Sequence, residues 1–184
     1  MSLTIYTIGH STREFDELVD ILKEYKIEQL IDVRTVPKSR HVPQFNHDTL
    51  EKKLPKEDIA YLHLSKLGGL RHVRKDSINQ GWHNKSFRGY ADYMQTEEFA
   101  EGMDQLEKLA KDKQVAIMCA EALPWRCHRS MIGDALLVRK HKVIDIFDIK
   151  KTQDEKLTSF AKVKGKTITY PDDGESDKKT AQDD

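Results

Sequence analysis

Short apolar runs alternate with amphipathic stretches along most of the chain. The apolar runs lie at residues 3–8, 27–33, 59–64, 115–119 and 143–147, and their lengths predict buried strands. Apolar residues spaced i, i+3, i+4 and i+7 predict intervening helices, which cover residues 15–25, 46–54, 97–111 and 126–140. This alternation predicts the α/β fold class, with a single domain, a mostly parallel sheet and helices on both faces.

Polar residues next to these stretches predict where helices begin and where the chain forms a loop. Ser11 and Glu14 form an S-x-x-E capping box, Asn46 precedes the second helical stretch, and Thr96 precedes the third. Apolar periodicity vanishes from residue 71 to 85, which predicts one long polar loop. Loops of this length in compact domains are usually functional or disordered, and we expect a functional one because aromatic residues follow it. Residues 157–170 are expected to add a short β element.

Charge is distributed unevenly, although the 184 residues carry no formal net charge. Residues 172–184 hold six acidic residues and two lysines, a net charge of −4, and we expect them to form a disordered acidic tail. The remaining body, residues 1–171, then has 29 basic and 25 acidic residues, a net charge of +4. We expect this body to be one α/β domain that is compatible with phosphate-bearing partners.

Several classes of protein are disfavoured by composition. No apolar run approaches ~18 residues, so we expect no membrane partner. The first residues show no basic segment followed by an apolar one, and the chain has only two cysteines. We therefore expect a cytoplasmic protein with free thiols. The sequence leaves the oligomeric state open and indicates no particular cofactor.

One segment of eleven residues gathers most of the candidate chemistry. The apolar run at 115–119 ends in Cys119 and is followed by Glu121, Cys127, His128 and Arg129. In an open α/β sheet, ligands bind outside the carboxyl ends of the strands. The free N–H groups of a following helix would bind an anion or stabilise a thiolate there. We therefore place the candidate site at this edge of the sheet.

Glu121 and Cys119 are the candidate catalytic residues. Glu121 would act as a general acid or base, or bind a ribose diol; the alternative is an ion pair with Arg126 or Arg129 that orders the loop. Cys119 would be a nucleophile, and the alternative is a small buried residue. A phosphatase-like Cys-x5-Arg loop is disfavoured, because Trp125 stands sixth after Cys119 and Arg126 follows it.

Other polar residues follow the first two strands and share the same predicted edge. Gly9 would allow a ligand close to the backbone, with His10 as a donor, while Asp32 and Arg34 end the second strand. Guanidinium groups match phosphate oxygens. The candidate substrate-binding residues are therefore Gly9, His10, Asp32, Arg34, Arg40, Tyr90 and Arg129, with Arg34, Arg40 and Arg129 as the phosphate clamp.

Tyr90 belongs to a group of aromatic residues, with Trp82 and Phe87, that alternates with arginines. This pattern is compatible with base stacking along single-stranded nucleic acid, or with rings that pin the loop to the body. Cys127 is expected in the core. Structural zinc usually binds to Cys-x2–4-Cys pairs, which Cys119 and Cys127 do not form, so we expect no metal.

Seven motifs together point to a family. They are YTIGHS at 6–11, DVR at 32–34, PQF at 43–45, LGG at 67–69, FRGYADYM at 87–94, MCAE at 118–121 and WRCHR at 125–129. The chain resembles the domain-of-unknown-function family 488 over residues 4–171. The resemblance implies no particular activity. Members tend to carry a histidine where this chain has Asp145, and another near Lys156.

Three functions follow from these observations. The leading hypothesis is an enzyme that acts on a phosphate-bearing small molecule or nucleic acid at the carboxyl edge of the sheet. The first alternative is a non-catalytic module that binds nucleic acid or nucleotides. The second alternative is a thiol redox sensor in which Cys119 and Cys127 pair on oxidation.

Overall fold

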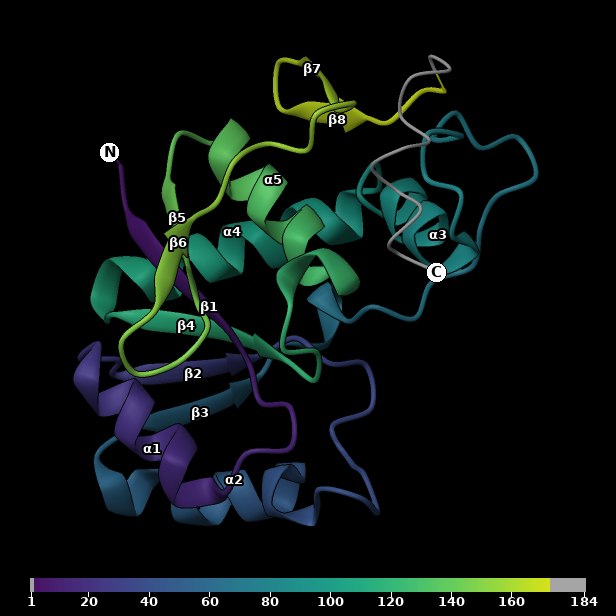
Figure 1. Ribbon diagram of the computed structural model, residues 1–184. Helices are drawn as coiled ribbons and strands as arrows, with labels where there is room; N and C mark the ends of the chain where they lie inside the picture. Colours follow the sequence, from purple (N-terminus) through teal and green to yellow (C-terminus); the bar gives the residue numbers. More distant parts are fainter. Residues whose placement is uncertain (1, 173–184) are drawn as a thin grey trace.

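The computed structural model describes residues 2–172 and shows one sheet between two layers of helices (Figure 1). The sheet has six strands in the order β3-β2-β4-β1-β5-β6. Their bounds are β1 Thr4–Gly9, β2 Gln29–Asp32, β3 Ala60–His63, β4 Val115–Cys119, β5 Lys142–Ile146 and β6 Thr152–Asp154. The first five are mutually parallel, and β6 pairs antiparallel with β5. The predicted α/β domain with a mostly parallel sheet is therefore confirmed.

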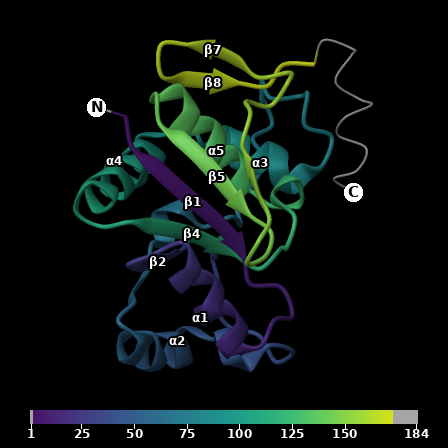
Figure 2. The same cartoon turned by 60° about the vertical axis from the view of Figure 1, so that its left-hand side comes forward.

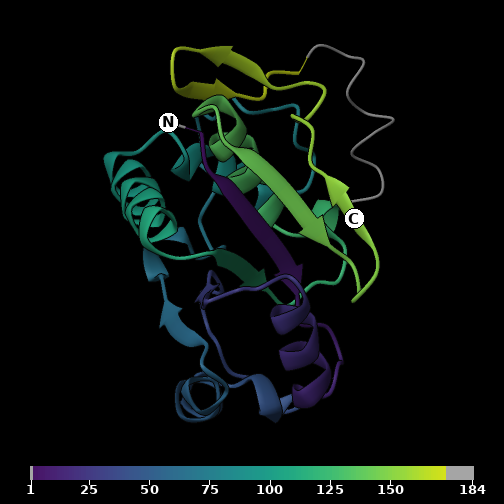
Figure 3. The same ribbon diagram turned by 90° about the vertical axis from the view of Figure 1, so that its left-hand side faces the viewer.

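Helices cover both faces of the sheet, as predicted. Helices α1 (Phe15–Glu24) and α2 (His47–Lys53) lie on one face, and α3 (Lys85–Tyr93), α4 (Glu97–Asp112) and α5 (Arg129–Val138) lie on the other (Figures 1 and 3). Two separate apolar clusters result, because successive residues of a strand point to opposite faces. Along β4, Ala116 and Met118 pack toward α1 and α2, whereas Ile117 and Cys119 pack toward α3, α4 and α5.

Smaller elements complete the described part of the chain. The predicted C-terminal β element is a hairpin of β7 (Lys162–Lys164) and β8 (Thr167–Thr169), which lies beyond α5 and far from α1 and α2 (Figure 2). Four short 3-10 turns occur at η1 Pro43–Phe45, η2 Pro55–Glu57, η3 Ser65–Leu67 and η4 Pro124–Arg126. None of the helices within residues 2–172 is long and apolar enough to cross a membrane. The predicted acidic tail lies, from residue 173 onward, outside the described residues.

The predicted capping box at Ser11 is wrong. The backbone N–H groups of His10 and Ser11 donate to the carbonyl oxygens of Cys119 and Ala120, at 2.9 and 3.0 Å, and so extend the pairing of β1 with β4. Ser11 then turns the chain at φ 50°, and α1 begins only at Phe15. Pairing with β4 therefore prevails over the local helix signal.

The other two predicted caps differ from each other. The hydroxyl of Thr96 accepts a hydrogen bond from the backbone N–H of Phe99, as predicted. Asn46 stands at the N-cap of α2 without capping it, because its side-chain oxygen accepts from the N–H of Ser39 at 2.7 Å. That bond fastens the loop after β2 to the start of α2.

The sheet brings the carboxyl ends of β1, β2 and β4 to one edge. Gly9 is the partner of Cys119 in the register, and Asp32 is the partner of Met118. The N–H of Val33 also donates to the carbonyl oxygen of Met118 at 3.0 Å. Residues that follow these three strands are therefore held close together by backbone hydrogen bonds.

Candidate active site

A pocket of about 440 Å³ opens at the carboxyl ends of β2 and β4. Four segments contribute to its wall: the loop after β2, the turn after η3, the start of α3, and the connection from β4 to α5. The chemically active side chains among its lining residues are Arg34, Cys119, Glu121, Arg126, Cys127 and His128. Both cysteines of the protein therefore face one pocket, and both are free thiols.

Cys119 is the deeper of the two thiols. It ends β4, and 1% of its surface is exposed. Nε of Arg129 donates to Cys119 Sγ at 3.2 Å, and this sulfur lies 3.6 Å from the carbonyl oxygen of Glu121. Burial raises the pKa of Cys119 well above its ordinary value, and the neighbouring Cys127 adds to this effect. Cys119 therefore stays protonated.

Cys127 lies just before α5 and is 7% exposed. Burial alone would raise its pKa, but hydrogen bonding from the Cys119 thiol and the charge of Arg129 hold the pKa below its ordinary value. Its sulfur lies 3.3 Å from Nδ1 of His128. Of the two coupled thiols, Cys127 is thus the one that ionises more readily and is more accessible to solvent.

His128 is oriented by three neighbours. Its Nε2 lies 2.8 Å from the carbonyl oxygen of Val33 and therefore donates to it, which leaves Nδ1 as the acceptor that faces Cys127. Burial lowers the pKa of His128, so the ring is neutral. Tyr90 packs against it at 4.8 Å, and a Cβ at Gly69 would lie 2.5 Å from Nδ1. The imidazole is therefore placed to accept the proton of Cys127.

Arg129 is fully buried behind Cys119. Besides the sulfur, it donates to the hydroxyl of Thr7 at 2.6 Å and to the carbonyl oxygen of Glu121 at 3.0 Å. Within residues 2–172, none of its hydrogen-bond partners is a carboxylate. Burial opposes its charge, but the two thiols and Asp145 raise the pKa of Arg129, which remains cationic.

A second buried group lies beside the pocket and consists of His10, Asp32 and Arg34. Arg34 donates from Nε and Nη2 to both carboxylate oxygens of Asp32, at 2.9 and 2.6 Å. Its Nη1 donates to Nε2 of His10 at 3.2 Å, and Nδ1 of that ring donates to the carbonyl oxygen of Ser11. Burial lowers the pKa of His10 to about 4, and the ring stacks on Phe45. Most donors of Arg34 are therefore directed into the protein.

Gly9 shapes the pocket through the close approach of two backbones. A Cβ at this position would lie 1.6 Å from the carbonyl oxygen of Glu121. The loop after β4 thus rests directly on the end of β1, and only glycine leaves room for it. This contact holds Glu121 at the pocket wall with its side chain exposed.

The residues named from the sequence occupy three different positions. Cys119, Glu121 and Arg34 line the pocket, whereas Gly9, His10, Asp32 and Arg129 lie directly behind its wall. Arg40 is exposed on the loop after β2 and is not among the pocket's lining residues. Tyr90 is fully buried and donates to the carbonyl oxygen of Leu67 at 2.9 Å. The three arginines of the predicted clamp therefore do not present free guanidinium groups to one surface.

Sequence reasoning missed the importance of Cys127, His128 and Arg126. Cys127 was expected in the core because Met131 and Ala135 follow it at helical spacing. Cys127 is buried in the same core cluster as these two residues, as expected, and it also lines the pocket, because the helix begins only at Arg129. Its position directly before the amphipathic stretch was the available signal, since thiols at helix N-termini are activated.

The aromatic residues around the long polar loop are buried. Trp82, Phe87 and Tyr90 belong to the core on the side of α3, and the Trp82 and Phe87 rings meet edge to face at 5.1 Å. The buried carboxylate of Asp92 accepts hydrogen bonds from Ser77 and Asn79, at 2.6 and 2.7 Å. The loop is therefore pinned to the body by its aromatic and polar side chains.

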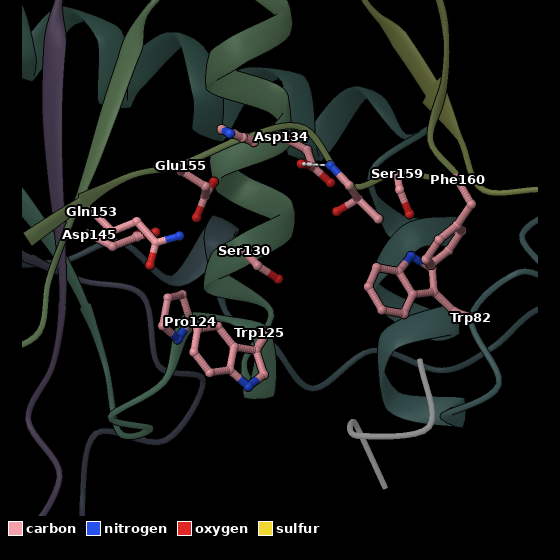
Figure 4. Close-up of a pocket in the computed structure, with 12 residues that line it drawn as sticks. Trp82, Pro124, Trp125, Ser130, Asp134, Asp145, Gln153, Glu155, Ser159 and Phe160 are labelled. Carbon is pink, nitrogen blue, oxygen red and sulfur yellow. Dashed lines mark hydrogen bonds between the residues drawn. The ribbon is translucent and has the colours of Figure 1, made fainter. Parts of the chain in front are cut away.

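A second pocket, of about 470 Å³, lies on the other side of η4. Figure 4 shows Asp145 and Glu155 at one end of it and Trp82 at the other. Burial raises the pKa of Asp145 and, well above its ordinary value, the pKa of Glu155. Asp145 is the residue that stands where the resemblance leads one to expect a histidine.

Potential metal ligands within residues 2–172 cluster on α2 rather than at the thiols. Single ligand atoms of His47, Asp48 and Glu51 lie within 4.8 Å of one another. Asp48 and Glu51 are exposed, and exposed acidic groups of this kind are common without a metal. This cluster therefore adds no site to the one described above.

The fold and the pocket define an α/β protein with a pair of coupled thiols at the carboxyl edge of a parallel sheet. The family profile described as Domain of unknown function DUF488 matches residues 14–136, and the chain belongs to this family. Neither the curated proteins nor the solved structures with which the chain was compared include a match.

Proposed function

We propose that the protein is an enzyme that acts on a phosphate-bearing substrate, a nucleotide or a nucleic acid, through a cysteine thiolate at the carboxyl edge of the sheet. The observation that carries this proposal is the contact of fully buried Arg129 with Cys119 Sγ at 3.2 Å. An unpaired buried charge is costly, so a buried guanidinium needs an anion close by. Cys119 lies within hydrogen-bond distance of this charge, and the pKa of the coupled Cys127 thiol is lowered, so that one thiolate in the pair would balance the guanidinium.

The negative charge belongs on Cys127 during reaction. Cys127 is more exposed than Cys119, and Nδ1 of His128 lies 3.3 Å from its sulfur to accept the proton. Cys119 keeps its own proton and stabilises the neighbouring thiolate by a hydrogen bond. Structural support of this kind is typical of activated cysteines.

The residues at the pocket support a two-step displacement. The Cys127 thiolate forms a bond to an electrophilic atom of the substrate while the bond from that atom to the leaving group breaks, and the leaving group departs with the electron pair. A water molecule then attacks the same atom, Glu121 takes the proton of the water, and the sulfur leaves as thiolate. Transfer of that proton from Glu121 to the leaving group restores the starting state.

A phosphate group would bind at the mouth of the pocket. Arg126 is exposed there, and the N-terminus of α5 begins three residues later. Guanidinium groups bind phosphate, because their forked donors match its oxygens. Arg126 therefore takes the part that the sequence alone assigned to the three arginines of the clamp.

Thermal unfolding with defined probes tests the proposal. The probes are inorganic phosphate, AMP, ribose 5-phosphate and a short single-stranded oligonucleotide, added to wild type, Arg126→Ala and the control Arg74→Ala. Arg74 is an exposed arginine of the long loop and is not among the residues that line the pocket. A probe at 100 times its Kd should raise the Tm of wild type and the control by about 5–10 °C. The same concentration of probe should leave the Tm of Arg126→Ala unchanged. Equal shifts in all three proteins, or none, would contradict the phosphate site.

The position of both thiols at one pocket also favours the thiol redox sensor as a second candidate. Mild peroxide would then join Cys119 and Cys127, and the intact mass would fall by about two daltons. An unchanged mass would exclude the sensor. A non-catalytic binding module would bind the same probes in wild type and in Cys127→Ser, and would turn over none of them in either protein. The enzyme would turn over a probe in wild type and lose this turnover in Cys127→Ser.

A further inference from the structure

We infer that Thr7 and Asp145 are positioning residues for the thiol pair and that they act through Arg129. The inference rests on the proposed function, because it concerns the same thiolate. Neither residue lines the thiol pocket, so neither would touch the substrate. Their effect reaches the sulfur atoms through a chain of buried hydrogen bonds that crosses three strands.

The sheet register places this chain of groups on one face. Thr7, in β1, is the partner of Asp145 in β5 and of Ile117 in β4. Cys119 follows Ile117 by two residues and therefore points to the same face. Figure 3 shows β1 and β5 side by side. Thr7 and Asp145 are thus fixed by the backbone of the central sheet, which makes them rigid supports.

The hydrogen bonds run continuously from Asp145 to the sulfur. The Thr7 hydroxyl donates to Oδ1 of Asp145 at 2.5 Å, and the same hydroxyl accepts from Nη1 of Arg129 at 2.6 Å. Nε of Arg129 then donates to Cys119 Sγ at 3.2 Å. All four residues are at most 4% exposed, so water does not compete for these bonds. Because Asp145 holds the hydroxyl proton, the lone pairs of Thr7 are left for Arg129.

Two opposing effects on the thiolate follow from this geometry. Thr7 holds the guanidinium plane against Cys119 and so supports the charge on the thiol pair. The negative charge of Asp145 partly offsets the field of Arg129 and so opposes a thiolate. The other titratable groups that face Asp145 are Glu155, in the second pocket (Figure 4), and Arg129. Those that face the thiols are His128, Glu121, Tyr90 and Arg129.

The pH dependence of Cys127 alkylation by iodoacetamide tests the inference without requiring a substrate. In Thr7→Val the guanidinium loses its acceptor, and the pKa of Cys127 should rise by about one unit, which slows alkylation about tenfold at pH 7. Thr7→Ser keeps the hydroxyl and should therefore show the same pH dependence of Cys127 alkylation as wild type. In Asp145→Asn the side-chain oxygen still accepts from Thr7 while the charge is lost, so the pKa of Cys127 should fall and alkylation should accelerate.

Thr4→Val is the matched control, because Thr4 is an exposed threonine on the same strand. Circular dichroism establishes that each variant is folded. Unchanged profiles in folded Thr7→Val, or a slower reaction in Asp145→Asn, would overturn the inference. A wild-type Cys127 with the reactivity of an ordinary thiol would instead contradict the proposed thiolate, and the two failures are therefore distinguishable. If Thr7→Val does not fold, the other two variants still test the inference. Faster alkylation of Cys127 in Asp145→Asn, together with a wild-type pH profile in Thr7→Ser, would then support it.

Discussion

Single residues at the site are polar, buried and closely paired. Arg129 and Arg34 each place a guanidinium in the interior, and their partners differ in kind: a thiol, a hydroxyl and carbonyl oxygens for Arg129, and the carboxylate of Asp32 for Arg34. Breaking a buried pair usually costs about 3–5 kcal/mol, because the remaining charge is left uncompensated. Replacing Asp32 would therefore destabilise the fold, whereas thiol chemistry at Cys127 leaves Arg34 untouched. The two arginines are therefore held differently: Arg34 is paired with a carboxylate, and Arg129 belongs to the proposed thiol site.

A first prediction concerns His10, whose imidazole is buried between Arg34 and Phe45. Burial lowers its pKa to about 4, from 6.5 for a free histidine. We expect an NMR titration to show this ring neutral down to about pH 4, with Nδ1 protonated. The signal is assigned by its loss in His10→Gln. A midpoint close to 6.5 would contradict the buried contact between His10 and Arg34.

At the level of residues, the sequence indicated which side chains lie close together better than which neighbours each of them contacts. Cys119, Glu121 and Arg34 were named because each stands at the end of a buried strand or within two residues of it, and all three line the pocket. Cys127 was correctly expected in the core, but its place at the pocket wall was not foreseen, since the start of a helix cannot be read to within one turn from periodicity alone. The burial of Tyr90 depends on contacts with His128 and Leu67, which are distant in sequence.

Among the elements, the long loop after η3 and helix α3 behave as one unit. Asp92 of α3 is buried and accepts hydrogen bonds from the backbone N–H of Arg74 and from the side chains of Ser77 and Asn79. The start of α3 in turn contributes Ser86 and Phe87 to the pocket. The order of the loop is therefore linked to the shape of the candidate active site.

A second prediction follows for Asp92→Ala. Three donors lose a charged acceptor, and we expect the free energy of unfolding to fall by about 3 kcal/mol. Hydrogen exchange should accelerate at the backbone N–H groups of residues 74–82. The control is Asp76→Ala, an exposed carboxylate of the same loop, which should change stability by less than about 0.5 kcal/mol. Equal effects of the two variants would argue against the anchoring role of Asp92.

Elements with strong periodicity were predicted well, and those decided by tertiary contacts were not. Strand β4 has its predicted bounds, and α4 begins after Thr96 as expected. Helix α3 was missed because its sequence is rich in aromatic and polar residues without a simple apolar stripe. Strand β6 was missed because its three residues are exposed, so that only pairing with β5 defines it. The helix start at Ser11 failed because backbone pairing with β4 took up its N–H group.

The whole molecule contains buried groups whose contributions to the free energy of unfolding change with pH in opposite directions. The pKa of His10 is lowered, so its contribution to stability is present above pH 6.5 and is lost as the pH falls toward 4. Burial raises the pKa of Asp134 to about 6, from 3.8. Its contribution is therefore fully present below pH 3.8 and is lost as the pH rises through 6. The two effects largely cancel in wild type between pH 4 and 6.

A third prediction separates them. Asp134→Asn cannot ionise, and its side-chain oxygen can still accept from the N–H of Thr158. We expect its free energy of unfolding, relative to wild type, to increase by about 2 kcal/mol as the pH rises from 4 to 7. Urea unfolding at each pH measures this difference, and the exposed Asp154→Asn serves as control. A difference that is independent of pH would show that Asp134 is ionised throughout this range.

The central claim is that Cys127, supported by Cys119, His128 and Arg129, is a reactive thiolate. The most direct measurement is the rate of alkylation by iodoacetamide as a function of pH, with the modified residue identified by peptide mass spectrometry. We predict that Cys127 reacts first, with an apparent pKa below the ~8.5 of a free cysteine, and that Cys127→Ser abolishes this reaction while Cys119→Ser retains modification of Cys127. Reaction at Cys119 first, or at neither thiol before the protein unfolds, would contradict the claim.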